Sequence, residues 1–476
     1  MTHQHQSTSS SVSSVRQLRV CPAKGIAAVA VAILAAVAMT GIASAASRAT
    51  KQTPIMAGTT APRSSTSGQS SATGGGTMEV WDWETAADEP GEHVVLEDNL
   101  KIWNKEHPKD IISETEMSLP DQLAKLPLAL STPSSAPTIT QVNEGYESMG
   151  RLVADGELLP LNSYNKKYGW EKETGLSPVQ LNSFNAKGSE LGVGNIYGIP
   201  TSGALIGVFY NKKILASVGA KPPTTWAEMV KDFALVKKAG QVPIAYSSGQ
   251  PTAYRPERVW TVILDHYALP QLTIGIVDHK PGATIETKAV IESAATFQQW
   301  GKDGYFTPGY SGLSDTAGLT QFTSGKAAFF IEGNWYASAI ITGLGSNAGF
   351  WEPPSTTGGP DEGWSIPKYS NDPSLAVDFI NLVLSPQAQT HELKVGDIPL
   401  VAPTAKELAG APLLVQQVVK GWQEVVRNNT LVPFIDWATP DFINQFYANL
   451  QALQAGRMSP SAFAATMESD YVSGGG

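Results

Sequence analysis

Cysteine is nearly absent from this chain: Cys21 is the only one in 476 residues. With one thiol, no disulfide can form within the chain and no cluster of thiolates can hold a metal. Histidine is also scarce, with seven scattered residues. The adjacent His391 and Glu392 point in different directions on a helix, so we interpret them as a surface pair. The sequence therefore predicts no metal and no cofactor.

Charge is sparse, with a moderate excess of acidic over basic residues. Charged residues make up 16% of the chain, and the formal net charge is −10. An acidic surface repels nucleic acid and anionic lipid, so neither is expected as a partner. The twelve tryptophans are many for this length. Low charge with many indoles suits a protein whose ligand is neutral and polar.

The common catalytic signatures are missing as well. The chain has no His-Glu-x-x-His, no Gly-x-Ser-x-Gly and no P-loop. Gly192, Gly194 and Gly198 are spaced wrongly for a dinucleotide-binding loop. With 43 acidic residues, two carboxylates could still flank a cleft, so a secreted glycosidase stays open as an alternative.

The first 77 residues are expected to lie outside the fold. Residues 1–45 carry bases, then an uncharged Ala/Val/Ile-rich stretch, and end with Ala43-Ser44-Ala45, which fits a cleavage site. This pattern predicts an export signal, with an uncleaved membrane anchor as the alternative. Residues 46–77 are rich in Ser, Thr and Gly and predict a disordered linker.

The remaining residues, from Met78, are too many for one core and predict two domains. Apolar alternation predicts strands at 78–83, 111–117 and 137–142, with helical patterns between them. This β-α-β-α-β order is the rhythm of a doubly wound sheet. A further apolar run at 205–210 predicts a buried strand.

Two helix starts are marked by capping residues. Thr225 stands three residues before Glu228, which predicts a capping box at the start of a helix reaching about Ala239. Asp372 precedes Pro373, which predicts a cap with proline at the first helical position.

Several blocks resemble one family. The segment 197–228, the block Phe322-Thr323-Ser324-Gly325-Lys326-Ala327-Ala328 followed by Gly333-Asn334-Trp335, and the block 363–389 are similar to the extracytoplasmic solute-binding proteins of sugar ABC importers. The resemblance to this maltose-binding-protein-like family (bacterial solute-binding protein family 1) runs from Met78 to about Tyr471. Many relatives carry a lipidated Cys directly after the apolar stretch of the leader. Cys21 lies before that stretch here, so the pattern for lipid attachment is missing.

The resemblance implies a two-lobed α/β fold of the type II periplasmic-binding kind. Each lobe is expected to be a doubly wound sheet, and a three-segment hinge joins them near 197–201, 361–365 and 401–409. Lobe I is expected at 78–198 and 365–407, and lobe II at 199–364 and 408–476. A ligand held between such lobes favours the closed state because it touches both.

The ligand-binding residues are expected on loops after strands, at the inter-lobe cleft. Flat apolar faces would contact pyranose rings and polar groups would bind the hydroxyls. The predicted residues are Trp83, Glu84, Glu144, Tyr146, Thr201, Ser202, Tyr254, Arg255, Glu332, Asn334, Trp335, Trp364, Asp436 and Trp437. For most of them a structural role is the alternative, and Arg255 is the one for which a surface charge is favoured.

The sequence therefore predicts an exported, monomeric, non-enzymatic sugar- or oligosaccharide-binding component of an ABC importer. It is expected at the outer face of the cell membrane or in the periplasm, where it delivers ligand to the transmembrane permease subunits. The alternatives are a secreted carbohydrate-active enzyme, or the same fold with a peptide or polyamine as ligand. A strongly acidic cleft would favour a polyamine.

Overall fold

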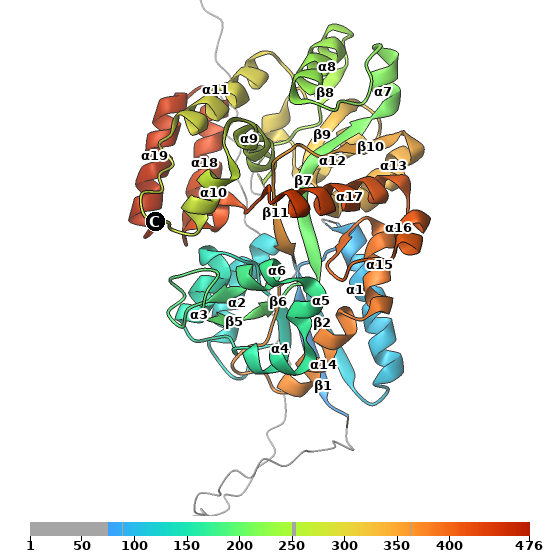
Figure 1. The fold of residues 1–476 in the computed structure, drawn as a ribbon, viewed down its shortest axis with the longest axis vertical. Helices are drawn as coiled ribbons and strands as arrows, with labels where there is room; N and C mark the ends of the chain where they lie inside the picture. The colour runs from blue at the N-terminus through green and yellow to red at the C-terminus, as the bar shows by residue number, and fades with distance from the viewer. Residues whose placement is uncertain (1–74, 88, 250–253, 362) are drawn as a thin grey trace, which may run out of the picture. The chain divides into compact units, whose positions relative to one another are not determined.

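The structure is a computed structural model that describes residues 75–87, 89–249, 254–361 and 363–476. The predicted export signal lies outside the described residues, and so does the predicted linker up to residue 74. All described residues belong to one unit, which has two lobes built on separate sheets (Figure 1). Among them, no helix has the length and apolar character needed to cross a membrane.

The first lobe is built on a five-stranded sheet in the order β2-β1-β3-β12-β6. Strands β1, β2 and β3 are parallel, and β12 runs antiparallel to both β3 and β6. The alternation of buried Met78, Val80 and Asp82 in β1 places one face of this strand against the core, as the sequence predicts. The strands are β1 (Thr77–Asp82), β2 (Ile111–Glu116), β3 (Ile139–Gln141), β6 (Gly198–Ile199) and β12 (Trp364–Ser365), with a separate pair β4 (Ser183–Phe184) and β5 (Asn195–Ile196).

Helices cover this sheet, and the predicted cap is present at one of them. The Asp372 carboxylate accepts hydrogen bonds from the backbone N–H groups of Ser374 and Leu375 at 3.1 and 3.2 Å, with Pro373 opening α14. The helices of this lobe are α1 (Pro90–Glu106), α2 (Leu119–Leu130), α3 (Arg151–Ala154), α4 (Asn162–Tyr168), α5 (Trp170–Thr174), α6 (Leu176–Leu181), α14 (Pro373–Val383) and α15 (Pro386–Val395), with a π-helical turn η1 (Tyr146–Gly150).

The second lobe is built on a sheet in the order β14-β11-β7-β9-β8. Its central strand β7 is buried along its whole length, which confirms the predicted strand at 205–210. Strands β10 and β13 also pair with β7, so a single long strand organises this lobe. The strands are β7 (Ser202–Asn211), β8 (Val242–Ile244), β9 (Ala327–Gly333), β10 (Ala348–Trp351), β11 (Thr356–Asp361), β13 (Ile398–Pro399) and β14 (Leu431–Val432).

The predicted capping box in this lobe is only half formed. The Thr225 hydroxyl accepts from the Glu228 N–H at 3.2 Å, but Glu228 Oε2 accepts from the N–H and hydroxyl of Thr224 at 2.9 and 2.8 Å. The helices are α7 (Lys212–Ser217), α8 (Trp226–Lys238), α9 (Tyr254–Tyr267), α10 (Pro270–Val277), α11 (Lys288–Lys302), α12 (Asp315–Thr323), α13 (Ala337–Leu344), α16 (Ala405–Gly410), α17 (Leu413–Asn428), α18 (Phe442–Gln454) and α19 (Pro460–Ser473). Short 3-10 turns are η2 (Tyr310–Gly312), η3 (Asn334–Tyr336), η4 (Gly345–Asn347) and η5 (Ile435–Ala438).

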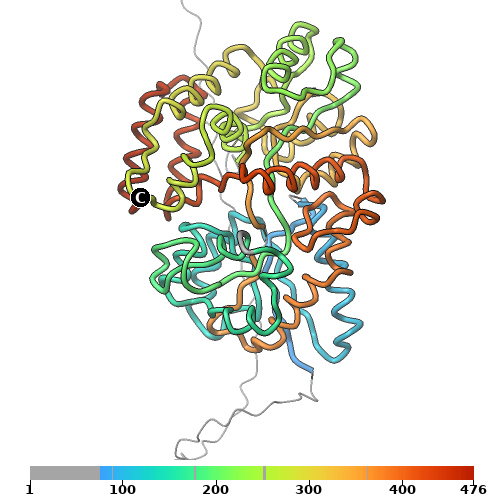
Figure 2. The backbone as a smooth tube through the Cα atoms, viewed as in Figure 1, coloured from blue at the N-terminus to red at the C-terminus, as the bar shows by residue number. Residues whose placement is uncertain are grey.

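The chain passes repeatedly between the two sheets (Figure 2). The sheet changes between β6 and β7 and between β11 and β12, within the first two predicted hinge segments. Trp364 already pairs in the first lobe's sheet, and β13 pairs with β7 of the second lobe although it lies inside 365–407. Helix α16 begins at Ala405, within the third predicted hinge segment. The domain boundaries and the hinge remain predictions.

Candidate functional site

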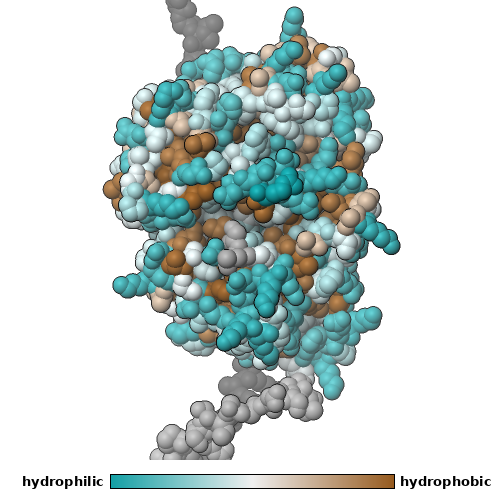
Figure 3. Space-filling view, viewed as in Figure 1, coloured by the Kyte–Doolittle hydropathy of each residue, from teal (hydrophilic) through white to brown (hydrophobic). Residues whose placement is uncertain are grey.

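Two adjoining cavities are lined by residues of both lobes, and together we call them the cleft. Their volumes are about 660 and 560 Å³, counting the part open to solvent. On the face shown in Figure 3, apolar side chains gather along the band between the lobes. The cavities share Trp83, Glu89, Leu119, Tyr254, Arg258 and Trp335.

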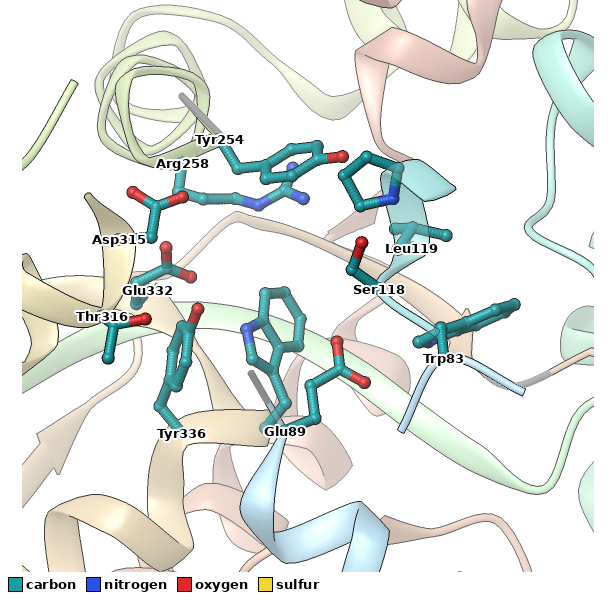
Figure 4. A pocket seen from close by; sticks show the side chains of 12 residues that line it. Trp83, Glu89, Ser118, Leu119, Tyr254, Arg258, Asp315, Thr316, Glu332 and Tyr336 are labelled. Atoms are coloured by element: carbon teal, nitrogen blue, oxygen red, sulfur yellow. The ribbon is translucent and has the colours of Figure 1, made fainter. Parts of the chain in front are cut away.

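Aromatic side chains from both lobes form walls of the cleft. Trp83 comes from the loop after β1, whereas Tyr254, Trp335 and Trp437 come from the second lobe. In Figure 4, Tyr254 lies at the top of the first cavity and Trp83 at its right. Trp83 and Trp437 are only 4% and 3% exposed, so each packs into its lobe while it borders the cleft. Such rings offer flat apolar surfaces to a ligand.

A glycine fixes the position of Trp335. This indole follows β9 in the turn η3 and folds back over the end of the strand. A Cβ atom on Gly333 would lie 2.2 Å from the Trp335 ring, far inside van der Waals contact. The Gly-x-Trp spacing seen in the sequence therefore has a steric reason, because only glycine lets the ring approach this closely.

Arg255 is neither at the surface nor on the wall of the cleft. Its side chain is fully buried, and its guanidinium donates to Glu332 at 3.0 Å, Ser247 at 2.9 Å and the Asp315 carbonyl at 3.1 Å. Both Glu332 and Asp315 line the first cavity. The interpretation of Arg255 as a surface charge is thus wrong. Its buried guanidinium pairs with Glu332 and Asp315, two carboxyls that line the cleft.

Arg258 lines both cavities, and sequence reasoning missed it. It lies one helical turn after Tyr254 in α9, so the two side chains share a helix face, and this spacing could have revealed it. The Arg258 guanidinium lies 2.6 Å from Glu257 Oε2, and 5.7 Å from the centre of the Trp335 ring. Figure 4 shows Arg258 beside Tyr254.

A group of buried acids surrounds Arg258. Burial raises the pKa of Glu257 to about 8, and Arg258 opposes this rise. The Tyr447 hydroxyl donates to Glu257 at 2.9 Å. Burial also raises the pKa of Asp436, which lines the second cavity, while Arg258 again opposes the rise. Burial raises the pKa of Glu147 well above its usual range, and the nearby Asp436 adds to this effect.

Glu144 and Tyr146 lie two residues apart, before and at the start of η1, but have different surroundings. Glu144 lines the second cavity and accepts a hydrogen bond from Asn182 at 3.1 Å. Burial raises the Glu144 pKa well above its usual range. Tyr146 does not line the cleft, since its hydroxyl accepts from the Leu191 N–H at 3.1 Å and its ring stacks on His279.

Three predicted residues border a separate, smaller cavity instead. Glu84, Thr201 and Trp364 line a space of about 210 Å³ together with Glu392. Trp364 is 1% exposed and belongs to the first lobe's core. Glu392 is 2% exposed, so the interpretation of His391 and Glu392 as a surface pair is wrong for Glu392. Burial raises the pKa of both Glu84 and Glu392 well above the usual range.

Ser202 and Asn334 lie in the interior and do not line the cleft. Ser202 is the first residue of β7 and is fully buried. Asn334 accepts from the Leu205 N–H at 2.7 Å and donates to Asp397 at 2.6 Å. Asn334 thus links β7 to the segment before β13, which is a structural task.

Seven predicted residues line the cleft: Trp83, Glu144, Tyr254, Glu332, Trp335, Asp436 and Trp437. Sequence reasoning missed further lining residues, among them Glu89, Ser118, Leu119, Pro120, Asn143, Asp315, Thr316, Tyr336, Asp361 and Phe434. Within the described ranges, no group of three or more His, Cys, Asp or Glu side chains could hold a metal ion. Aromatic faces next to carboxyl, amide and hydroxyl groups can bind a polyhydroxylated molecule reversibly.

Comparison with known families gives a match over most of the chain. The sequence profile of the bacterial extracellular solute-binding proteins matches residues 87–390. Binding proteins of Brucella abortus and Brucella suis are 24% identical to this chain over 192 residues. That stretch is 40% of this chain and 43% of each relative, so the match spans less than half of their length.

Solved structures share the fold at low sequence identity. A chitin oligosaccharide binding protein has a TM-score of 0.73 at 21% identity, covering 84% of this chain and 98% of its own. The GacH receptor of Streptomyces glaucescens, solved unliganded and with acarbose, has a TM-score of 0.66 at 18% identity, covering 84% and 98%. A maltose-bound protein of T. maritima has a TM-score of 0.66 at 13% identity, covering 83% and 99%. These likenesses establish the two-lobed fold.

Proposed function

The chain belongs to the bacterial extracellular solute-binding proteins, and we propose that it captures a sugar or oligosaccharide in the cleft between its lobes. In this proposal it acts outside the cell membrane and delivers the ligand to the permease subunits of an ABC importer. It binds as a monomer and makes or breaks no covalent bond. The residues proposed to contact ligand are the seven predicted residues that line the cleft, together with Arg258.

One observation carries the proposal: aromatic faces from both lobes border the same cavity. Trp83 comes from the first lobe, and Tyr254 and Trp335 come from the second. A ligand that contacts both sets is bound better when the lobes are close, so it shifts the population toward the closed state. The related structures named for chitin oligosaccharide, acarbose and maltose support a carbohydrate as the ligand class.

A thermal-shift screen against mono- and oligosaccharides tests the proposal. A ligand at 100 times its Kd adds about 2.7 kcal/mol to the stability of the folded state, and this raises the melting temperature measurably. Calorimetry then measures the affinity, and chromatography of the recovered sugar shows whether it is intact.

The glycosidase alternative has a distinct signature. Turnover of a glycoside by the purified protein, lost when one acidic residue of the cleft is changed to its amide in a variant that still folds, would replace binding with catalysis as the function. Recovery of intact sugar after long incubation supports capture. Export rests on the leader pattern in residues 1–45, and N-terminal sequencing of protein from the native host tests cleavage near Ala45.

A further inference from the structure

Carboxyl groups dominate the polar lining of the cleft. Arg258 is the only cationic side chain among the described residues that line the two cavities. Sugar hydroxyls are neutral donors and acceptors, so they do not by themselves require such an excess of acid. The acidic side chains that line the cleft are Glu89, Glu144, Asp315, Glu332, Asp361 and Asp436.

Two of these carboxyls, Glu332 and Asp315, are already paired with the positive charge of a buried arginine, Arg255. The buried Arg255 guanidinium lies 3.0 Å from Glu332 Oε1 and 3.8 Å from Asp315 Oδ1. Glu332 also accepts a hydrogen bond from the Gly333 N–H at 2.8 Å. The protein itself therefore balances this side of the cleft, and a ligand need not supply charge there.

Asp436 is different. Its side chain lines the second cavity and is only 4% exposed, yet its Oδ1 has no hydrogen-bond partner among the described residues. Arg258 is the one cation that acts on three buried acids, Glu147, Glu257 and Asp436, and it lies closest to Glu257, at 2.6 Å. Buried acceptors in native proteins nearly always have a donor, so the missing donor is expected to come from a ligand.

The surroundings of Asp436 also favour a positive charge. The ring faces of Trp335, Phe434 and Trp437 border the same cavity, and aromatic faces attract cations. The protein already uses this attraction, because the Arg258 guanidinium lies 5.1 Å from the Phe434 ring centre and 5.7 Å from the Trp335 ring centre. An ammonium group near Asp436 would meet a carboxylate and aromatic faces together.

We propose that the ligand is a sugar that carries a protonated amino group, with its ammonium donating to Asp436 Oδ1 and its ring faces against the indoles of the cleft. This inference rests on the proposed function and names the substrate class of the same site. A charged donor forms a stronger hydrogen bond to a carboxylate than a hydroxyl does, which gives specificity for the amine. The indole faces favour a pyranose over a flexible polyamine chain.

Matched pairs of sugars test the proposal on the unchanged protein. The pairs are glucose with glucosamine, galactose with galactosamine, and β-1,4-linked tetramers of glucose or N-acetylglucosamine with the tetramer of glucosamine. Calorimetry is done at a pH below the pKa of the amine. We expect an amino sugar to bind about tenfold or more tightly than its neutral partner. Spermidine serves as the non-sugar cation.

The outcomes separate this inference from the function on which it rests. A neutral sugar that binds as tightly as its amino partner overturns the inference and leaves sugar capture intact. Binding of spermidine with no binding of any sugar overturns both. Failure of every amino sugar to bind overturns the inference.

A pair of variants assigns the amine to Asp436. Asp436→Asn should lower the affinity for the amino sugar about tenfold or more and leave that for its neutral partner nearly unchanged. Asp265→Asn is the matched control, because Asp265 is also a buried acid of the second lobe but does not line the cleft. Equal losses for both sugars in Asp436→Asn would overturn the assignment. If this variant does not fold, the sugar pairs on the unchanged protein decide.

Discussion

Tyr146 of the first lobe stacks on His279 of the second, with ring centroids 4.3 Å apart and 5° between the ring planes. His279 follows α10 and its Nε2 lies 2.6 Å from the Ala438 carbonyl oxygen, which fixes the ring. Beside this stack, a Cβ on Gly145 would lie 2.5 Å from the Cβ of Trp437, so glycine is what allows this approach. The stack is thus a direct contact between the lobes, next to the cleft but outside its lining.

Removing this stack should favour the open state. An aromatic pair contributes about 0.5–1.5 kcal/mol, so Tyr146→Leu should shift the closure equilibrium roughly 2- to 10-fold and weaken ligand binding by up to that factor. Small-angle scattering with and without ligand measures closure as a change in radius of gyration of roughly 1 Å. Tyr146→Phe keeps the ring and is the control. Equal behaviour of the Leu and Phe variants would mean that the stack does not influence closure.

Trp335 should contribute mainly to binding. Trp335→Ala is expected to cost about 2–4 kcal/mol of binding free energy, the range of a hot-spot aromatic residue. Because Trp335 is only partly buried, the melting temperature should change little. Trp364→Phe is the counterpart, since Trp364 lies in the first lobe's core and should lose stability with little loss of affinity. Calorimetry measures the affinity of each variant and thermal unfolding measures its stability. A Trp335→Ala variant that loses stability but keeps its affinity would show that Trp335 is structural, and a Trp364→Phe variant that loses affinity but keeps its stability would show that Trp364 binds ligand.

Much of the fold follows from local patterns in the sequence. The strands at 77–82 and 202–211 alternate or stay apolar over several residues, and Asp372 caps its helix in the expected way. The two-residue strands β12 and β13 were not predictable, because so short a segment has no periodicity and pairs only through tertiary contacts. For the same reason, the sequence cannot place the lobe boundary to the residue.

A cleft residue could be predicted from the sequence where it directly follows a strand whose end lies at the cleft. Trp83 after β1 and Trp335 after β9 are such cases. Once Tyr254 is placed at the cleft, the spacing along α9 selects Arg258 and not Arg255, because residues four apart share a helix face and adjacent residues do not. Residues at the starts of distant helices, such as Leu119 in α2 and Asp315 in α12, reach the cleft only through tertiary structure and carry no local signal.

Asp265 should make stability depend on pH. Burial raises its folded-state pKa from 3.8 to about 7, although the Thr357 hydroxyl donates to it at 2.9 Å. The folded state therefore binds the Asp265 proton more strongly than the unfolded state does. The free energy that this proton adds to folding is fully present below pH 4 and is lost as the pH rises through about 7. Asp265→Asn should match the parent near pH 4 and exceed it by up to about 4 kcal/mol near pH 8.

Urea unfolding at several pH values checks this difference. Asp121→Asn controls for the loss of an aspartate as such, because Asp121 is exposed on α2. A constant difference between Asp265→Asn and the parent at every pH would show that folding does not shift the pKa of Asp265.

The Arg255–Glu332 pair should behave as one structural unit. Both side chains are buried, so removing either charge leaves the other without compensation, which costs about 3–5 kcal/mol. Arg255→Met and Glu332→Gln should each be strongly destabilising. The double variant should lose much less than the two single losses together, because no charge of this pair is then left buried alone. Arg427→Met, at an exposed position in α17, controls for the loss of an arginine as such. Denaturant unfolding of the parent, the two single variants and the double variant measures the coupling, and additive losses would show that Arg255 and Glu332 act independently.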